Sequence, residues 1–448
     1  MNLRPILHSG PMAFLLLVLL QAPLVFNPGW FSHDELQWAA RADVARFADL
    51  PWVAWSNWLA FQYRPITFNL WLLLSYLFFA TPYLMHGVFV GLGSLNALLL
   101  AAVLEGAGVE RRVALAAAAI FVLSPFVAYV HGWVGTLADL LVLLVALLGL
   151  RLLQGMTGMD DYRDALATAA TMLLMAAALF CKESAVVLPL ALLPALYRHP
   201  YPRRALVAIV LSSVPALAYL LLRIATLLAS PVAHAGYAWS LQQAPLRLAE
   251  YLLFPFMPPL LEVGATLDKS PLRLLAAAVC LALLLVALAR RGWHWPLAWL
   301  GLVAALLGPV LILATSYRQY AYLASAAAVG IAATAWERLG RLLRAALALV
   351  MAVTILHGAS VMGRMHAVGV VQHNFDTDLR HLLAHGIEAP LIAPAASADR
   401  WMLERFLHEV PTYGHARLAK PGRPATFIMQ RDGHLVPIHA ARGAAAAR

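Results

Sequence analysis

Two adjacent carboxylates stand just after the first apolar run of the chain, in the stretch "FSHDELQW". A carboxylate held above a lipid surface can act as a general base that takes the proton from an attacking hydroxyl group. The alternative is a structural role, since acids suit the first turn of a helix that starts near Ser32. Adjacent residues on a helix point about 100° apart, so only one of the two can face a given cleft. We therefore expect Asp34 to be the base and Glu35 its neighbour, with His33 beside them in a secondary role.

The same two acids raise the question of a metal ion. Divalent cations such as Mg²⁺ and Ca²⁺ prefer several oxygen ligands. No third carboxylate stands near Asp34 and Glu35 in the sequence to complete such a set. A divalent metal is thus conceivable, but no metal or other cofactor is predicted.

Several cations stand beside aromatic residues, outside the strongly basic loops. Arg64 lies in "FQYRPITFNLW", Lys182 in "LFCKESAVV" and Arg318 in "TSYRQYAY". A guanidinium group can hold a phosphate through two parallel hydrogen bonds, whereas the structural alternative is an arginine that extends to the lipid headgroups. For Lys182 the alternative is a local ion pair with Glu183. The candidate ligands of a lipid phosphate are Arg64, Lys182, Arg318, His131 and Arg223, and the supporting residues are Tyr63, His86, Asn96, Asp139, Glu183, Tyr320 and Tyr322.

One of these supporting residues, Asp139, is an acid inside an apolar run. It lies about two helical turns beyond the "HGW" turn at 131–133. An acid at such a depth costs about 2.5–3.5 kcal/mol on insertion scales. We therefore expect Asp139 to pair with a donor inside the helix bundle, which is a structural role.

One base and several cations fit one reaction type better than others. A sugar linked to a polyprenyl phosphate has a phosphate leaving group, which needs stabilisation of its charge and no protonation. A glycosidase would need two carboxylates that flank the scissile bond. The pattern favours sugar transfer from a polyprenyl-phosphate donor to an acceptor hydroxyl.

The composition indicates what kind of scaffold must position these residues. Of 448 residues, 62% are hydrophobic and 12% charged, whereas soluble domains carry about 25% charged residues. Runs such as "AFLLLVLLQAPLVF" and "LLAAAVCLALLLVALA" are typical of membrane helices, which need about 20 residues each. We predict an all-α polytopic membrane protein with about 11 transmembrane helices. The predicted spans are roughly 9–26, 83–104, 113–130, 134–153, 165–180, 185–197, 205–228, 271–289, 295–314, 320–335 and 344–361.

Charge decides the orientation of these spans. The formal net charge of +10 reflects arginines in short loops such as "YRHPYPRR" and "WERLGRLLR", so we expect no nucleic-acid partner. If the apolar segment 66–80 lies in the interface without spanning, these loops face the cytoplasm, as the positive-inside rule requires. The loop 27–65, the three turns "HGW", "CKES" and "SYRQY", and the segment 229–270 then share the exoplasmic face.

The tail at 362–448 differs in composition from the rest. "DTDLRHLLAHG" and "DRWMLERFLHEV" are typical of short amphipathic helices, and "RPATFIMQRDGHLVPIH" of a hairpin that turns at Asp432 and Gly433. We predict a transmembrane module at 1–361, whose first exoplasmic loop at 27–82 holds interfacial helices. A small exoplasmic α/β domain at 362–448 follows, with a disordered end. Cys181 and Cys280 lie in or beside apolar runs and are expected to be core residues without a disulfide.

Five short motifs, taken in order, resemble the GT-C glycosyltransferases. They are "HDE", "YRPITFNLW" with "YLMHGVFVGLGSLNALL", "HGWVGTLADLL", "CKESAVVLPLALL" and "SYRQYAYLASA". The nearest likeness is to protein O-mannosyltransferases, namely the transmembrane O-mannosyltransferase branch and its bacterial relatives. It covers roughly residues 10–335.

The resemblance implies a role for each matching residue. Asp34 would be the catalytic base, and Arg64, Lys182 and Arg318 would lie near the lipid phosphate, while His86 and Asn96 match positions in the second span. The chain departs from the family in the third motif, where Thr136 or Leu137 stands in place of the arginine that the family carries. His131 is a candidate to replace it. The TPR repeats of the eukaryotic branch are absent, which leaves a protein acceptor undecided.

The leading hypothesis is a GT-C-like membrane glycosyltransferase of the hexosyl- or mannosyltransferase type, inverting at the anomeric carbon. Its donor is a polyprenyl-phosphate sugar, and its acceptor is a hydroxyl group of a protein, lipid or glycan. We expect a multi-pass protein of the cell membrane, of the bacterial inner-membrane type, with its active site on the exoplasmic or periplasmic face. The alternatives are a transporter or flippase, which would place charges near the midplane and show repeats, and a polysaccharide polymerase or ligase that uses lipid-linked sugars.

Overall fold

The computed structural model describes most of the chain. The described residues are 4–30, 38, 41–42, 45–56, 58–60, 62–158, 160–229, 238–256, 261–387, 390–397, 400–407, 417–418 and 425–438. His33, Asp34 and Glu35 lie outside these ranges. Their predicted roles therefore stay predictions.

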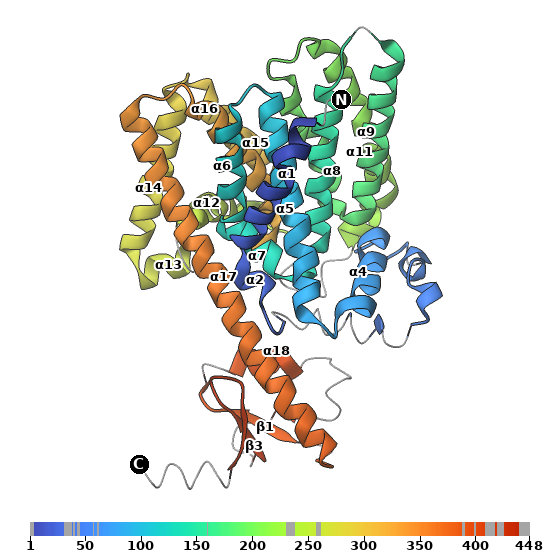
Figure 1. Ribbon diagram of the computed structural model, residues 1–448, viewed down its shortest axis with the longest axis vertical. Helices are drawn as coiled ribbons and strands as arrows, with labels where there is room; N and C mark the ends of the chain where they lie inside the picture. Colours follow the sequence, from blue (N-terminus) through green and yellow to red (C-terminus); the bar gives the residue numbers. More distant parts are fainter. Residues whose placement is uncertain are drawn as a thin grey trace.

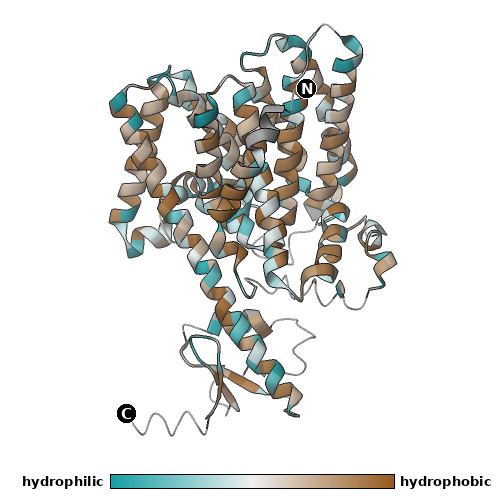
Figure 2. Cartoon of the chain, in the orientation of Figure 1, coloured by the Kyte–Doolittle hydropathy of each residue, from teal (hydrophilic) through white to brown (hydrophobic). Residues whose placement is uncertain are grey.

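Long apolar helices form the body of the molecule (Figures 1 and 2). Seven of the described helical segments are long and apolar enough to cross a membrane. Six of these spans are helices α5 (Pro82–Gly106), α9 (Asp161–Cys181), α11 (Pro202–Ala229), α14 (Pro271–Ala289), α15 (His294–Leu311) and α17 (Arg341–Ala384), and the seventh joins η3 (Val134–Thr136) to α8 (Leu137–Gln154). The prediction of an all-α polytopic membrane protein is confirmed.

Several predicted spans are shorter or more broken than their sequence indicated. The run at 9–26 is divided between α1 (Arg4–Leu19) and α2 (Ala22–Val25). The run at 185–197 becomes three short pieces, because Pro189 and Pro194 lack the backbone N–H that a continuous helix needs. These pieces are η4 (Glu183–Val187), α10 (Leu188–Ala191) and η5 (Leu193–Leu196). The span predicted at 320–335 contains helix α16 (Tyr322–Trp336).

A bend interrupts the span predicted at 113–130. Helices α6 (Arg111–Val122) and α7 (Pro125–Gly132) meet at 62°, with Pro125 as the first residue of α7. Helix α17 crosses this bend at Gly358, where an added Cβ would lie 1.8 Å from the Leu123 carbonyl oxygen. Only glycine allows the two backbones to approach so closely.

Helix α17 is 44 residues long and runs past the predicted end of the membrane module at residue 361. Figure 2 shows its second half as more polar than its first. The separate short helix predicted for "DTDLRHLLAHG" is wrong, because this stretch is the last part of α17. No proline interrupts 341–384, so nothing in the backbone ends the helix earlier.

A small sheet packs beside the end of α17 (Figure 1). Its strands are β1 (Leu391–Pro394), β2 (Arg417–Leu418), β3 (Phe427–Met429) and β4 (Leu435–Pro437), in the order β2-β1-β3-β4, and helix α18 (Arg400–Leu407) lies between β1 and β2 in the chain. Strand β1 is parallel to β2 and β3, and β3 is antiparallel to β4. The predicted hairpin is confirmed, with Gly433 at φ +96° in its turn. The Asp378 carboxylate of α17 accepts a hydrogen bond from the Leu435 backbone N–H at 2.8 Å, which attaches the sheet to the helix.

Helix α4 (Pro65–Phe78) covers most of the apolar segment 66–80, which could either cross the membrane or lie in its interface. Its 14 residues extend about 21 Å, less than the roughly 30 Å of a bilayer core. This length agrees with an interfacial helix. Before α4 come two short 3₁₀ turns, η1 (Phe47–Asp49) and η2 (Val53–Ser56), and all three lie at the same end of the bundle as the C-terminal sheet (Figure 1).

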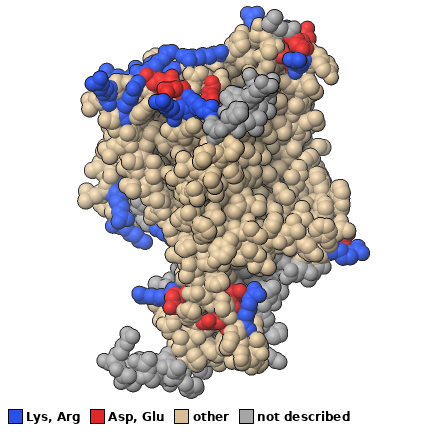
Figure 3. Space-filling model, viewed as in Figure 1, with Lys and Arg blue, Asp and Glu red and all other residues tan. Residues whose placement is uncertain are grey.

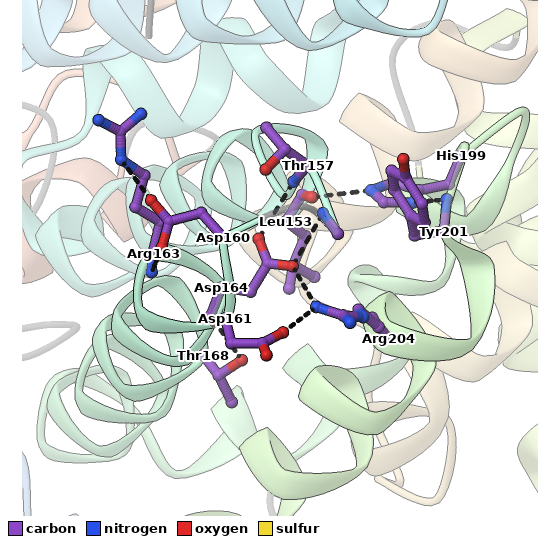
Figure 4. A network of polar contacts seen from close by, with 11 residues as sticks. Leu153, Thr157, Asp160, Asp161, Arg163, Asp164, Thr168, His199, Tyr201 and Arg204 are labelled. Atoms are coloured by element: carbon purple, nitrogen blue, oxygen red, sulfur yellow. Dashed lines mark hydrogen bonds and ion pairs between the residues drawn. The ribbon is translucent and has the colours of Figure 1, made fainter.

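The opposite end of the bundle carries the loops predicted to be cytoplasmic, and Figure 3 shows basic side chains gathered along it. Figure 4 shows how α9 and α11 are joined there. The buried Asp164 carboxylate accepts hydrogen bonds from the backbone N–H groups of Thr157 at 3.1 Å and Gly158 at 3.0 Å. Arg204 binds both Asp164, at 3.3 Å, and Asp161, at 2.6 Å. This network holds the loop between α8 and α9 against the start of α11.

The remaining described helices complete the side of the bundle that follows α11. They are η8 (Leu241–Gln243), α12 (Ala244–Leu253), η9 (Phe254–Phe256), α13 (Val263–Lys269) and η10 (Arg318–Ala321). An isolated antiparallel bridge between Trp239 and Leu313 joins the segment before η8 to the turn before η10.

Candidate active site

A cavity of about 830 Å³ lies beside α4, where segments far apart in the chain meet. It is lined by Trp38, Arg41, Ala45, Val53, Ala54, Ala60, Gln62, Tyr63, Arg64, Phe68, Trp71, Leu72, Trp133, Gly135, Ala138, Asp139, Lys182, Gln319 and Tyr320. These residues come from the loop before α4, α4 itself, the turn into α8, the end of α9 and η10. The predicted convergence of the first loop with the "HGW", "CKES" and "SYRQY" turns is therefore observed.

Arg64 is fixed at the wall of this cavity by Glu183. Its Nε donates to one oxygen of Glu183 at 2.7 Å and its Nη2 to the other at 2.5 Å. The two side chains are only 15% and 17% exposed. Burial disfavours the charge on each group, but the attraction between them outweighs it. The pKa of Arg64 is therefore raised and the pKa of Glu183 lowered, so both groups stay ionised.

Lys182 forms the second ion pair of the cavity. Its Nζ donates to Asp139 at 2.5 Å and lies 4.7 Å from the centroid of the Tyr320 ring. Burial lowers the pKa of Lys182, and the Asp139 carboxylate opposes that effect. Asp139 thus has the partner inside the bundle that its depth required. The alternative of a local pair between Lys182 and Glu183 is not what the structure shows, since Glu183 binds Arg64.

The charged side chains that line the cavity have a net positive charge, which favours the binding of an anion. Arg41, Arg64 and Lys182 face two carboxylates, those of Asp139 and Glu183, and this gives a net charge of 3 − 2 = +1 for these five side chains. The outer nitrogen of Arg64, Nη1, makes no hydrogen bond to the part of the chain that the structure describes. Such a donor can serve a phosphate oxygen without breaking the ion pair.

The sequence analysis missed Arg41. Its guanidinium carbon lies 5.1 Å from the centroid of the Trp38 ring, and both side chains line the cavity. The signal was available, because Arg41 lies in the loop 27–65, which is predicted to be exoplasmic and where the positive-inside rule disfavours a cation.

Arg223 has a different role from the one predicted. Its side chain is fully buried and donates to the backbone carbonyls of Trp58 and Ala60. Its guanidinium also lies over the rings of Trp58, at 5.1 Å, and Tyr63, at 5.5 Å. Arg223 does not line the cavity. It holds the segment that leads into Arg64, so we regard it as a positioning residue.

His131 does not lie at the membrane face, and this prediction is wrong. It is fully buried, with Nδ1 2.5 Å from Gln21 Oε1 and Nε2 2.8 Å from the Tyr322 hydroxyl. Both ring nitrogens are therefore occupied inside the bundle. Asn96 donates to the Leu140 carbonyl at 3.0 Å and to the same Tyr322 hydroxyl at 3.3 Å. These residues join the start of α2 to α5, α7, α8 and α16, and they lie outside the cavity lining.

His86 holds the backbone just before the stretch that begins at Phe31. Its Nε2 lies 2.9 Å from the Gly29 carbonyl oxygen. The next residue, Trp30, stacks on Phe79 at 4.8 Å and donates its backbone N–H to Gln372 at 3.0 Å. His86 thus positions the chain that enters the predicted catalytic loop, without contacting the cavity.

Arg318 does not line the cavity, although its neighbours Gln319 and Tyr320 do. Its guanidinium carbon lies 5.5 Å from the ring centroids of both Tyr129 and Phe254. Within the described ranges, no group of three or more His, Cys, Asp or Glu side chains is arranged to hold a metal ion.

Comparison with known proteins gives one similar structure. No protein-family model matches the chain, and no curated protein matches it. The crystal structure of ArnT from Cupriavidus metallidurans bound to undecaprenyl phosphate is similar at 14% sequence identity and a TM-score of 0.46, over 94% of this chain and 93% of that one. The resemblance to GT-C enzymes, and to protein O-mannosyltransferases among them, stays a prediction.

Proposed function

We propose that this protein is a GT-C-like membrane glycosyltransferase that moves a sugar from a polyprenyl-phosphate donor to an acceptor hydroxyl. The observation that carries the proposal is the cavity in which Arg64 and Lys182 meet from distant parts of the chain. Lys182 is buried and Arg64 is largely buried, and each is held in place by a carboxylate. Groups that are fixed before the substrate arrives need little reorganisation when charge develops on a leaving group.

The walls of the cavity suit a sugar joined to a lipid phosphate. Trp38, Trp71, Trp133, Tyr63 and Tyr320 provide aromatic faces beside the cations. Aromatic side chains combine apolar area with polar edges, which suits both a sugar ring and the start of a hydrocarbon chain. The position of the cavity beside the short helix α4 agrees with access from the membrane surface.

In the proposed reaction the acceptor oxygen attacks the anomeric carbon of the donor sugar. Its proton passes to the Asp34 carboxylate, and the bond between the anomeric carbon and the phosphate oxygen breaks with its electron pair on the oxygen. The polyprenyl phosphate leaves as an anion stabilised by Arg64, Lys182 and Arg41. Attack from the face opposite the leaving group inverts the configuration. The finer hypothesis, suggested by the five motifs, is mannosyl transfer.

The test measures release of polyprenyl phosphate from a panel of polyprenyl-phosphate sugars, mannose included. The full-length protein is reconstituted in nanodiscs, and membranes of a deletion strain supply the acceptor. Asp34→Asn should lower release about 100-fold, the usual contribution of a general base. Asp49→Asn removes an acid from the same loop, one paired with the exposed Arg46, and should leave release unchanged.

Two results would count against the proposal. Wild-type turnover by Asp34→Asn would remove the assigned base and favour a polymerase or ligase that works through arginines alone. Movement of intact donor between leaflets, with no cleavage of any sugar in the panel, would identify a flippase.

A further inference from the structure

The second half of α17 contacts the chain just before the predicted catalytic loop. Gln372 Oε1 accepts a hydrogen bond from the Trp30 backbone N–H at 3.0 Å. The Asn27 side chain accepts from the Gly29 backbone N–H at 3.1 Å and donates to the Met365 carbonyl at 3.3 Å. Asn27 is fully buried, and Trp30 and Gln372 are nearly so. Buried hydrogen bonds therefore join the entry of the loop to α17.

The two segments approach closely because two glycines meet between them. A Cβ added to Gly29 would collide with the Gly369 carbonyl oxygen, and a Cβ added to Gly369 would collide with the side chain of Asn27. Residues at 365, 369 and 372 lie on one face of a helix, and this face contacts the loop entry. Any side chain at either glycine would push the loop entry away from α17.

Trp30 is also fixed by two other elements. Its ring stacks on that of Phe79, at the end of α4, with the centroids 4.8 Å apart and the planes at 4°. His86 of α5 lies beside the same ring, at 5.3 Å between centroids, and contacts the preceding carbonyl oxygen, that of Gly29, at 2.9 Å. Trp30 is thus held by α4, α5 and α17 together.

A second fixed point follows at Trp38, beyond the predicted base. Its ring lies 4.8 Å from the centroid of Phe68 and 4.7 Å from that of Trp71, and it lines the candidate active site. Asp34 is four positions from Trp38 and four from Trp30 in the sequence. Four residues extend at most about 14 Å. The position of Trp30 therefore limits where the Asp34 carboxylate can lie.

The C-terminal hairpin supports the same part of α17 from a different face. Asn374 donates to the Asp432 carbonyl at 2.8 Å, and a Cβ added to Gly433 would collide with the Val371 carbonyl oxygen. The hairpin and the loop entry thus contact neighbouring faces of the same two helical turns.

We propose that Gly369 and Gln372 of α17 are positioning residues for the loop that carries Asp34. Neither lines the candidate active site, so they act through the loop entry at 29–30 and not on the substrate. The inference rests on the proposed function, in which the Asp34 carboxylate takes the proton of the acceptor hydroxyl. The extension of α17 beyond residue 361, with the sheet packed beside it, then serves the reaction by fixing the position of the base.

The first test compares two substitutions of Gln372. Gln372→Leu removes the acceptor of the Trp30 N–H at a similar volume, whereas Gln372→Glu keeps an acceptor oxygen. Release of polyprenyl phosphate by the full-length protein in nanodiscs gives kcat and KM for the donor. We expect Gln372→Leu to lower kcat about tenfold at nearly constant KM, because misplacing a catalytic group by about 1 Å can cost about 100-fold, while Arg64 and Lys182 still bind the donor. Gln372→Glu should recover most of kcat.

Amide hydrogen exchange gives a readout that needs no turnover. Peptides that cover 28–38 should exchange about tenfold faster in Gln372→Leu and in Gly369→Ala, since a buried hydrogen bond is lost or displaced. Peptides from α9 should exchange as in the wild type. Gly363→Ala is the matched control on α17, because the added Cβ meets no atom within 4 Å, and it should leave exchange in 28–38 and kcat unchanged.

Several results would overturn the proposal. Unchanged exchange in both Gln372→Leu and Gly369→Ala would show that α17 does not fix the loop entry. Faster exchange at wild-type kcat, or a rise in KM alone, would exclude a role in positioning the base. Equal losses of kcat in Gln372→Leu and Gln372→Glu would assign the effect to packing and not to the hydrogen bond. Absence of release by the wild type would overturn the proposed function instead, and the exchange rates would still show whether α17 holds the loop entry.

Discussion

Both carboxylate oxygens of Glu183 bind the guanidinium group of Arg64, although the two residues are 119 positions apart in the chain. The contact joins the start of α4 to the turn after α9. Because this ion pair is largely buried, the position of Arg64 in the cavity wall depends on an acid from another helix. The predictions below start from this relationship.

Glu183→Ala should destabilise the protein by about 3–5 kcal/mol, since it leaves the Arg64 charge buried without its partner. Unfolding of the detergent-solubilised protein in denaturant measures this loss. The double variant Arg64→Met/Glu183→Leu should lose less than Glu183→Ala alone, because no unpaired charge remains. If the double variant were less stable than Glu183→Ala, the attraction between Arg64 and Glu183 would outweigh the cost of burying their two charges.

Glu183 should also make stability depend on pH. Its pKa in the folded protein is lowered below the ordinary 4.5, so its contribution is complete above that value and is lost as the pH falls through the lower folded pKa. Melting temperatures from pH 7 down to about 3 should therefore show a smaller acid-induced loss in Glu183→Gln than in the wild type. Parallel curves for the two proteins would mean that Glu183 does not titrate in this range.

Lys182 and Asp139 should respond differently to substitution. Lys182→Gln should weaken donor binding about tenfold or more, since it removes a charged donor from the phosphate site. Asp139→Asn should keep donor binding but lower stability, because the carboxylate acts on Lys182 and not on the donor. Binding of a polyprenyl phosphate by microscale thermophoresis, with a melting curve for each variant, separates the two effects. Equal binding losses would place both side chains in contact with the ligand.

Arg223→Lys should weaken the segment before Arg64. A lysine cannot make the two forked hydrogen bonds to Trp58 and Ala60, nor stack in the same way on Trp58 and Tyr63. We expect faster proteolysis within 45–62 and a KM for the donor that rises about tenfold at nearly constant kcat. Arg203→Lys, at an exposed position of the same helix, is the matched control. A drop in kcat alone would argue for a direct catalytic role.

Two glycines of α17 should behave oppositely when changed to alanine. Gly358→Ala places a Cβ 1.8 Å from the Leu123 carbonyl oxygen, so α17 must move away from the bend between α6 and α7. We expect a loss of several kcal/mol, as for an overpacked core. Gly363→Ala meets no atom within 4 Å and should stabilise the helix by up to about 1 kcal/mol. Calorimetry of both variants tests the contrast, which would disappear if the helices were not in contact at Gly358.

How far sequence could predict the site differs from residue to residue. An acid in an apolar run must find a donor, so a partner for Asp139 was predictable, whereas the identity of that partner as Lys182 was not. Arg223 and Arg318 show the same limit. Their position outside the strongly basic loops marked them as unusual cations, but the contacts of each side chain depend on neighbours such as Trp58 and Phe254 that lie far away in the sequence.

The sequence by itself determined that the chain forms a bundle of apolar helices, where the basic loops lie, and that the C-terminal tail ends in a hairpin. These properties follow from hydrophobic length, from the charge of short loops and from local turn chemistry, all of which act over a few residues. Only the tertiary structure decided that Glu183 pairs with Arg64, that His131 faces the interior and that α17 continues to Ala384. The first two outcomes depend on contacts between segments more than 40 residues apart. The third depends on the absence of any local signal strong enough to end the helix. Neither property can be recognised from a short stretch of residues.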